Sequence, residues 1–89
     1  MYSCLESLYT LFEKYNFYLK NKEIQLNQFK LEFIKMDNPI DIFSITKIDN
    51  KFNILIPFKN MNTSFKTSIS SLDNLYSFLE LHLYNYNNK

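Results

Sequence analysis

Cys4 and His82 are the only cysteine and histidine of the chain, and a thiol beside an imidazole can perform nucleophilic catalysis. The imidazole would take the thiol proton, and the thiolate would attack the substrate. The two residues come from opposite ends of the sequence, so they could meet only if the terminal segments pack side by side. Each lies beside an apolar helical stripe. This placement favours a small buried side chain at Cys4 and a partly buried His82 over a catalytic pair.

Other catalytic and metal-binding chemistry lacks the residues that it needs. One cysteine and one histidine cannot complete a structural zinc site, and the nine acidic residues are scattered along the sequence. A glycine-rich phosphate loop is excluded because the chain contains no glycine. No further motif supports a triad of serine, histidine and aspartate. We therefore predict that the protein is not an enzyme and has no catalytic residue, metal, cofactor or small-molecule substrate.

The charge balance gives no electrostatic preference for nucleic acid or anionic membranes. The chain contains ten lysines, no arginine and nine acidic residues, so its formal net charge is +1. RNA binding through the outer sheet face and dispersed lysines is the alternative function, because aromatic rings on a sheet can stack on bases while lysines hold phosphates. The rings that could do so share the parity of the predicted core face, which favours core aromatics and dispersed surface lysines: Phe29, Phe33, Phe43, Phe52 and Phe65.

The composition predicts one small intracellular domain that spans residues 1–89. A hydrophobic content of 46% is too high for a disordered chain, and 89 residues are enough for one core. Glycine, alanine, valine, arginine and tryptophan are absent, which is typical of an AT-rich genome. The sequence has no signal peptide pattern and no apolar run long enough to span a membrane, so we expect a soluble protein. Without glycine, left-handed turn positions must go to Asn or Asp.

The segment 40–58 predicts the central hairpin of the fold. Two runs of β-forming residues meet at Asp49-Asn50, a pair typical of a type I′ turn with positive φ at both positions. In that register Ile45 faces Ile54 and Ile48 faces Lys51. One face of the hairpin is then apolar, with Phe43, Ile45, Phe52, Ile54 and Ile56, and the other is mixed, with Ile42, Ser44, Thr46, Asn53, Leu55 and Pro57.

Periodicity predicts a helix at each end of the chain. Apolar residues recur at spacings of three and four after a capping box at 3–6, which predicts a helix at about 4–19. A second stripe follows a hydroxyl cap at Ser70-Ser71 and predicts a helix at about 72–84. Residues 85–89 are expected to fray.

Alternation of apolar and polar residues predicts four strands, at about 28–35, 40–48, 51–58 and 64–69. Their short connections favour an antiparallel meander. Because each helix has one apolar stripe and the sheet one apolar face, we predict an α+β, two-layer sandwich of order α-β-β-β-β-α. Both helices should lie on the same face of the sheet.

In element order alone, the predicted chain resembles two groups of small proteins. One is the pair of small signal-recognition-particle proteins that dimerise and bind Alu-type RNA. The other comprises the RWD-type modules of kinetochore and ubiquitin-pathway complexes. The strong basic character of the first group and the proline signature of the second are absent here. The resemblance therefore concerns the fold alone, and no functional residue follows from it.

Apolar residues that the predicted core leaves out indicate a protein–protein interaction module, such as a subunit, adaptor or inhibitor of a larger assembly. The expected partner is another protein or a second copy of the chain. Phe17 lies off the stripe of the first helix, and Leu81 points away from the stripe of the second. Such apolar surface is typical of contact sites. The interface candidates are Phe78, Leu81 and Tyr84 on the second helix, and Ile42 and Leu55 on the outer sheet face.

Overall fold

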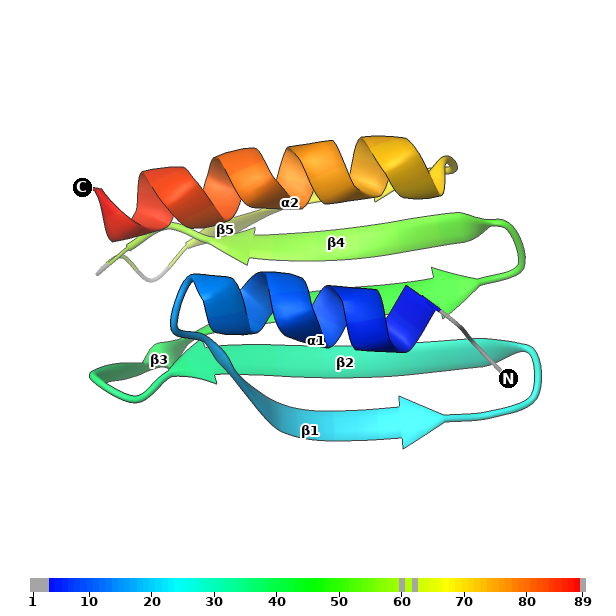
Figure 1. The fold of residues 1–89 in the computed structure, drawn as a ribbon, viewed down its shortest axis with the longest axis horizontal. Helices are drawn as coiled ribbons and strands as arrows, with labels where there is room; N and C mark the ends of the chain where they lie inside the picture. Colours follow the sequence, from blue (N-terminus) through cyan, green and yellow to red (C-terminus); the bar gives the residue numbers. More distant parts are fainter. Residues whose placement is uncertain (1–3, 60, 62, 89) are drawn as a thin grey trace.

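The computed structural model describes residues 4–59, 61 and 63–88, and it consists of a five-stranded antiparallel sheet with two helices on one face (Figure 1). The strands are hydrogen-bonded in chain order, which makes the sheet a meander. The architecture confirms the predicted α+β sandwich and adds one strand to it. The elements are α1 (Cys4–Lys14), β1 (Tyr18–Ile24), β2 (Gln28–Lys35), β3 (Asn38–Ile48), β4 (Lys51–Pro57), β5 (Ser64–Ile69) and α2 (Leu72–Asn87).

The central hairpin has the register that the sequence predicts. Ile45 pairs with Ile54 and Ile48 pairs with Lys51 across β3 and β4. The five residues assigned to the apolar face are all buried, with exposed fractions of 0–5%. Because side chains alternate across a strand, this pairing also fixes which residues lie on the opposite, outer face.

The hairpin turn has only one left-handed residue. Asp49 has a φ of 55°, whereas Asn50 is not among the described residues with positive φ. The expected type I′ turn was therefore wrong, because that type needs positive φ at both central positions. Lys47 Nζ donates a hydrogen bond to the Asp49 carbonyl oxygen at 2.5 Å. Asp49 is thus the turn residue that must adopt the left-handed conformation.

Helix α1 ends five residues earlier than predicted because Asn16 adopts a left-handed conformation with a φ of 67°. The Phe17 N–H donates to the Phe12 carbonyl at 2.9 Å, and the Asn16 N–H makes a second bond of 3.0 Å to Glu13. This pattern is a Schellman motif, which satisfies free carbonyls and reverses the chain. Phe17 packs edge-on against Phe12 and is only 1% exposed. Its expected surface position was wrong.

The segment after this motif forms an edge strand that the sequence did not reveal. β1 pairs with β2, and the register shifts by a bulge between Leu19 and Asn21. Every residue of β1 is exposed, so the strand has no buried face. Its sequence therefore lacks the alternation of apolar and polar residues that predicts a strand. Leu19 was expected in the first helix and instead lies in this strand, 37% exposed.

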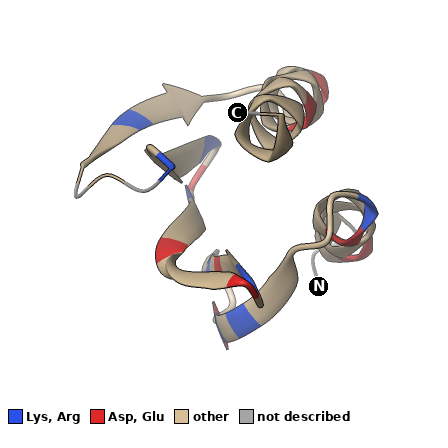
Figure 2. Ribbon diagram, turned by 90° about the vertical axis from the view of Figure 1, so that its left-hand side faces the viewer, with Lys and Arg blue, Asp and Glu red and all other residues tan. Residues whose placement is uncertain are grey.

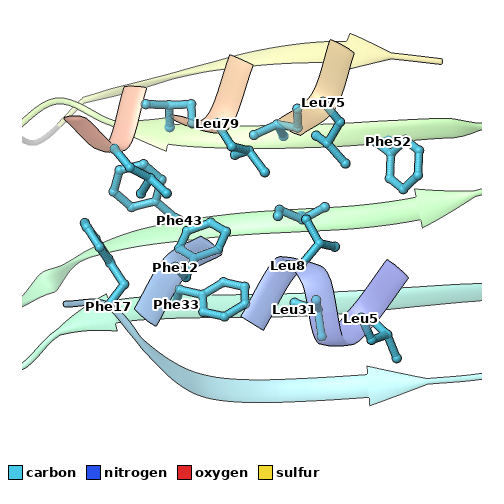
Figure 3. Close-up of a cluster of buried hydrophobic side chains, with 14 of the residues drawn as sticks. Leu5, Leu8, Phe12, Phe17, Leu31, Phe33, Phe43, Phe52, Leu75 and Leu79 are labelled. Carbon is cyan, nitrogen blue, oxygen red and sulfur yellow. The ribbon is translucent and has the colours of Figure 1, made fainter. Parts of the chain in front are cut away.

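Aromatic side chains fill the space between the sheet and the helices (Figure 3). Phe12 of α1 stacks on Phe33 of β2 with 3.8 Å between ring centroids, and it meets Phe43 of β3 edge-on at 6.0 Å. Three fully buried leucines of α2 complete the layer: Leu75, Leu79 and Leu83. Within the described residues, neither helix has the length and apolar character needed to cross a bilayer.

Helix α2 begins at the predicted cap and continues to Asn87, beyond its predicted end. The Ser71 hydroxyl accepts the Asn74 N–H at 3.4 Å, which is the expected N-cap. The predicted fraying of 85–89 was wrong for residues 85–87, and residue 89 lies outside the described residues. Asn87 accepts a hydrogen bond of 2.6 Å from Lys35 Nζ and donates one of 2.9 Å to a carbonyl of the loop after α1.

A buried polar contact holds this last turn to the sheet. Tyr86 is 6% exposed, and its hydroxyl donates to a carboxylate oxygen of the buried Asp41 at 2.6 Å. Asn38 donates to the same carboxylate oxygen at 3.1 Å and to the Tyr86 hydroxyl at 3.0 Å. Burial, followed by the hydrogen bond to Asp41, raises the pKa of Tyr86.

Tyr86→Phe should lower the free energy of unfolding by about 1–3 kcal/mol, because it removes a donor from a buried carboxylate. The Tyr86 pKa is raised on folding, so its contribution is complete below the ordinary pKa of about 10 and declines above it. The difference in the free energy of unfolding between the unmodified chain and Tyr86→Phe should therefore become smaller above about pH 10. Urea denaturation over a pH series measures both effects. Tyr84→Phe, at a side chain 55% exposed, is the matched control and should change stability by less than about 0.5 kcal/mol.

The hairpin turn gives a second prediction. Asp49→Gly should leave stability unchanged or raise it by up to about 1 kcal/mol, since glycine adopts positive φ without steric cost. Asn50→Gly should instead lower stability by about 0.5–1 kcal/mol, because the unfolded chain gains freedom with no strain relieved. Urea denaturation measures the stability of the two variants. A higher stability of Asn50→Gly than of Asp49→Gly would contradict the observed turn geometry.

Candidate functional site

The structure does not bring Cys4 and His82 together. Cys4 is the first residue of α1 and is half-buried, and burial raises the pKa of its thiol. His82 lies in the second half of α2, where its ring packs against Phe65 at 5.3 Å and Phe78 at 4.3 Å. The first turn of α1 and the last turns of α2 lie at opposite ends of the helical layer (Figure 1). The pair therefore has no nucleophile–base contact in this structure.

Charged side chains form no metal site within the described part of the chain, where no three His, Cys, Asp or Glu side chains gather. Lys14 of α1 and Glu80 of α2 make an ion pair of 2.8 Å between the helices. Each side chain shifts the pKa of the other in the direction that favours the charged form. Both are well exposed, so this pair is a surface contact between the helices and contributes little to stability.

The outer face of the sheet, defined here as the side opposite both helices, is uncovered by any described residue. Figure 2, which looks along the strands, has both helices on one side of the curved sheet and no described segment on the other. Lysines and acidic residues are spread over all the elements in this view. This outer face is the largest continuous part of the sheet that remains accessible to a partner.

Cross-strand pairing arranges the outer face in rows. The first, which we call the polar row, runs Lys30–Thr46–Asn53–Ser68 across β2, β3, β4 and β5. Ser68 Oγ donates to Asn53 Oδ1 at 2.5 Å within it. The second, which we call the charged row, runs Glu32–Ser44–Leu55–Lys66. Lys30 and Lys66 help to line a shallow hollow of roughly 570 Å³ over these two rows.

One end of the outer face is apolar. Ile40 is 79% exposed and Met61 is 60% exposed, and both line a hollow of roughly 220 Å³ with Ile42, Leu55 and Pro57. We call these five residues the apolar end. Ile42 and Leu55 are the two members predicted from sequence, and the structure brings them together, each half-buried. Ile40 was not predicted, although it has the same parity as Ile42. Met61 was not predicted either, because its loop position has no sequence signal.

The structure separates the three candidates on α2. Leu81 is 57% exposed and Tyr84 is 55% exposed on the side of the helix that faces away from the core. Phe78 instead lies half-buried against β5, with its ring 6.4 Å from Phe65. Leu81 and Tyr84 thus form a small exposed pair, which we call the α2 pair, on the opposite side of the molecule from the outer sheet face.

Edge strand β1 is protected against pairing with another strand. Its bulge between Leu19 and Asn21 interrupts the ladder, and Lys20 and Lys22 lie exposed within the strand. Bulges and lysines are devices by which sheet edges avoid adding further strands. β1 is therefore a poor template for strand addition.

Comparison with known proteins gives no match: no family model fits the sequence, and no curated protein or solved structure is similar to it at a significant level. The resemblance in element order to the small signal-recognition-particle proteins and the RWD-type modules thus gains no support.

Proposed function

We propose that this chain is a small protein–protein interaction module, a subunit, adaptor or inhibitor of a larger assembly, whose main binding surface is the outer sheet face. The observation that carries the proposal is the apolar end. It places two side chains that are more than half exposed, Ile40 and Met61, beside three half-buried or buried apolar neighbours. Exposed apolar clusters rimmed by polar residues are typical of contact sites.

The layout of this face supports the same proposal. An antiparallel sheet with one solvated face commonly presents polar residues there, as the polar row does. The apolar end departs from that pattern, and the charged row lies beside it with Glu32 and Lys66 at its two sides. An apolar contact area that polar and charged residues border is the usual anatomy of a protein interface. The α2 pair offers a second, smaller surface on the other side, which suits an adaptor.

RNA binding remains the second candidate, favoured by the two lysines that line the hollow over the polar and charged rows. Lysines there could hold phosphates. Base stacking has less support, because four of the five sheet phenylalanines, Phe29, Phe33, Phe43 and Phe52, are at most 5% exposed on the helix side. The fifth, Phe65, is half-buried against α2. These five rings are therefore not available on the outer face, where the exposed Tyr18 of β1 lies at the edge, so recognition of single-stranded bases has few of its usual contacts.

Ile40→Asp should abolish binding of the protein partner without unfolding the chain, because it places a carboxylate in the centre of the proposed contact. The measurement is quantitative affinity capture from a lysate of the source organism, with circular dichroism to verify the fold. Thr10→Asp, at an exposed polar position of α1, is the control and should retain the partner. Leu81→Asp reports on the α2 pair. Loss of the partner with Leu81→Asp and its retention with Ile40→Asp would move the interface to α2.

A salt titration decides between protein and RNA as the ligand. We expect no measurable affinity for single-stranded RNA even at low salt. RNA affinity that falls steeply with salt, and that Lys30→Gln with Lys66→Gln removes, would contradict this expectation, since counterion release drives binding to phosphates. Lys20→Gln with Lys22→Gln is the matched control, because it removes the same two charges at exposed positions of β1 outside the hollow.

A further inference from the structure

We propose that the partner of the outer sheet face is a second copy of this chain, and that the two copies form a symmetric dimer whose twofold axis runs parallel to the strands. This inference rests on the proposed use of the outer face as a binding surface. The order of residues along and across that face indicates which partner binds there. A twofold dimer presents the same patch on both copies, so the patch must be complementary to itself.

The separation of polar and apolar residues along the strands selects the direction of the axis. The polar row and the apolar end lie at different positions along β3 and β4. A twofold axis perpendicular to the strands and through the middle of the face would place the apolar end of one copy on the polar row of the other, and a perpendicular axis through the apolar end would leave most of the two faces without overlap. An axis parallel to the strands places each row on the same row of the second copy. The apolar ends of the two copies then meet, Leu55 lies over Ser44 of the second copy, and Thr46 lies over Asn53 of the second copy.

Charge complementarity follows from the same axis. Such an axis, running between β3 and β4, places β2 of one copy over β5 of the other. Glu32 on β2 and Lys66 on β5 belong to the same row. Glu32 therefore lies over Lys66 of the second copy, and the symmetry repeats this contact. Two opposite-charge pairs form at the margins of the interface, while Ser44 and Leu55 lie between them.

Sheet twist does not remove this match. Two sheets that pack face to face lie about 10 Å apart with their strands rotated by about 30°. Glu32 and Lys66 lie about one and a half strand spacings, or about 7 Å, from the axis. A rotation of about 30° displaces groups at that distance by about 4 Å. The flexible four-carbon stem of lysine covers such a displacement.

The size of the face predicts a weak dimer. Four strands span about 19 Å, and six residues along a strand span about 20 Å, which gives a footprint of roughly 400 Å² on each copy. Stable complexes bury about 800 Å² of accessible surface on each partner, so a footprint of this size falls below the standard range and belongs to weak, transient interfaces. We expect a dissociation constant in the micromolar range, with dimer formation that weakens as salt rises.

Sedimentation equilibrium over protein concentrations from about 1 µM to 1 mM tests the proposal, with circular dichroism to verify folding. Glu32→Lys and Lys66→Glu should each weaken the dimer at least about tenfold, because each places like charges opposite one another twice. The double variant should recover dimerisation, since the pairs are restored with reversed sign. A mixture of the two single variants should form a heterodimer. Lys22→Glu, at an exposed position of edge strand β1 that pairs with the inward-facing Leu31, is the charge-matched control and should dimerise like the unmodified chain.

Three results would overturn the inference. The first is an unmodified chain that stays monomeric throughout the concentration range. The second is a dimer that Leu81→Asp abolishes and Glu32→Lys leaves intact, which would place the contact on α2. The third is a double variant that folds but does not recover dimerisation. If the chain is monomeric while Ile40→Asp still abolishes capture of another protein, the proposed function stands and only the identity of the partner is wrong.

Discussion

The structure depends on one constraint: the fully buried apolar side chains of the sheet share a single face, and both helices must cover that face. The β3–β4 register establishes this arrangement, because Ile45 opposite Ile54 places the apolar parity of both strands on the same side. Phe12 then joins α1 to the sheet by stacking on Phe33. The two helices are the described elements outside the sheet, and both lie on this face. The outer face consequently stays uncovered by the described residues.

The absence of glycine determines how the chain changes direction. Asn16 and Asp49 occupy the two left-handed positions among the described residues, as expected for the residue types that tolerate positive φ. Asn16 ends α1 in a Schellman motif, and this reversal delivers Phe17 into the aromatic core. Asp49 closes the central hairpin. Turn geometry and core packing are therefore coupled, since the side chain that follows Asn16 is itself a buried core residue.

The sequence was sufficient for those elements whose residues bury one face locally. It predicted β2 and β5 with the observed bounds, the hairpin register and the Ser71 cap. It failed where the deciding contact is distant or absent. Tyr86 looked like part of a frayed tail because its partner, Asp41, lies 45 residues away. β1 was not predicted because none of its residues is buried. Helix α1 was predicted too long because Tyr15 and Leu19 continue the helical spacing of apolar residues past its end.

The candidate site was predictable for the same reason that the hairpin was. Once the inner parity of β3 and β4 is fixed, Ile42 and Leu55 must lie on the outer face, and they do. Rows across four strands require the pairing of β2 and β5 as well, which no single stretch of sequence contains. The inner core thereby determines the outer surface. A one-residue slip of β5 would move its apolar residues off the core, and it would also remove Lys66 from the row of Glu32. The burial that stabilises the fold therefore also holds the charged row in place.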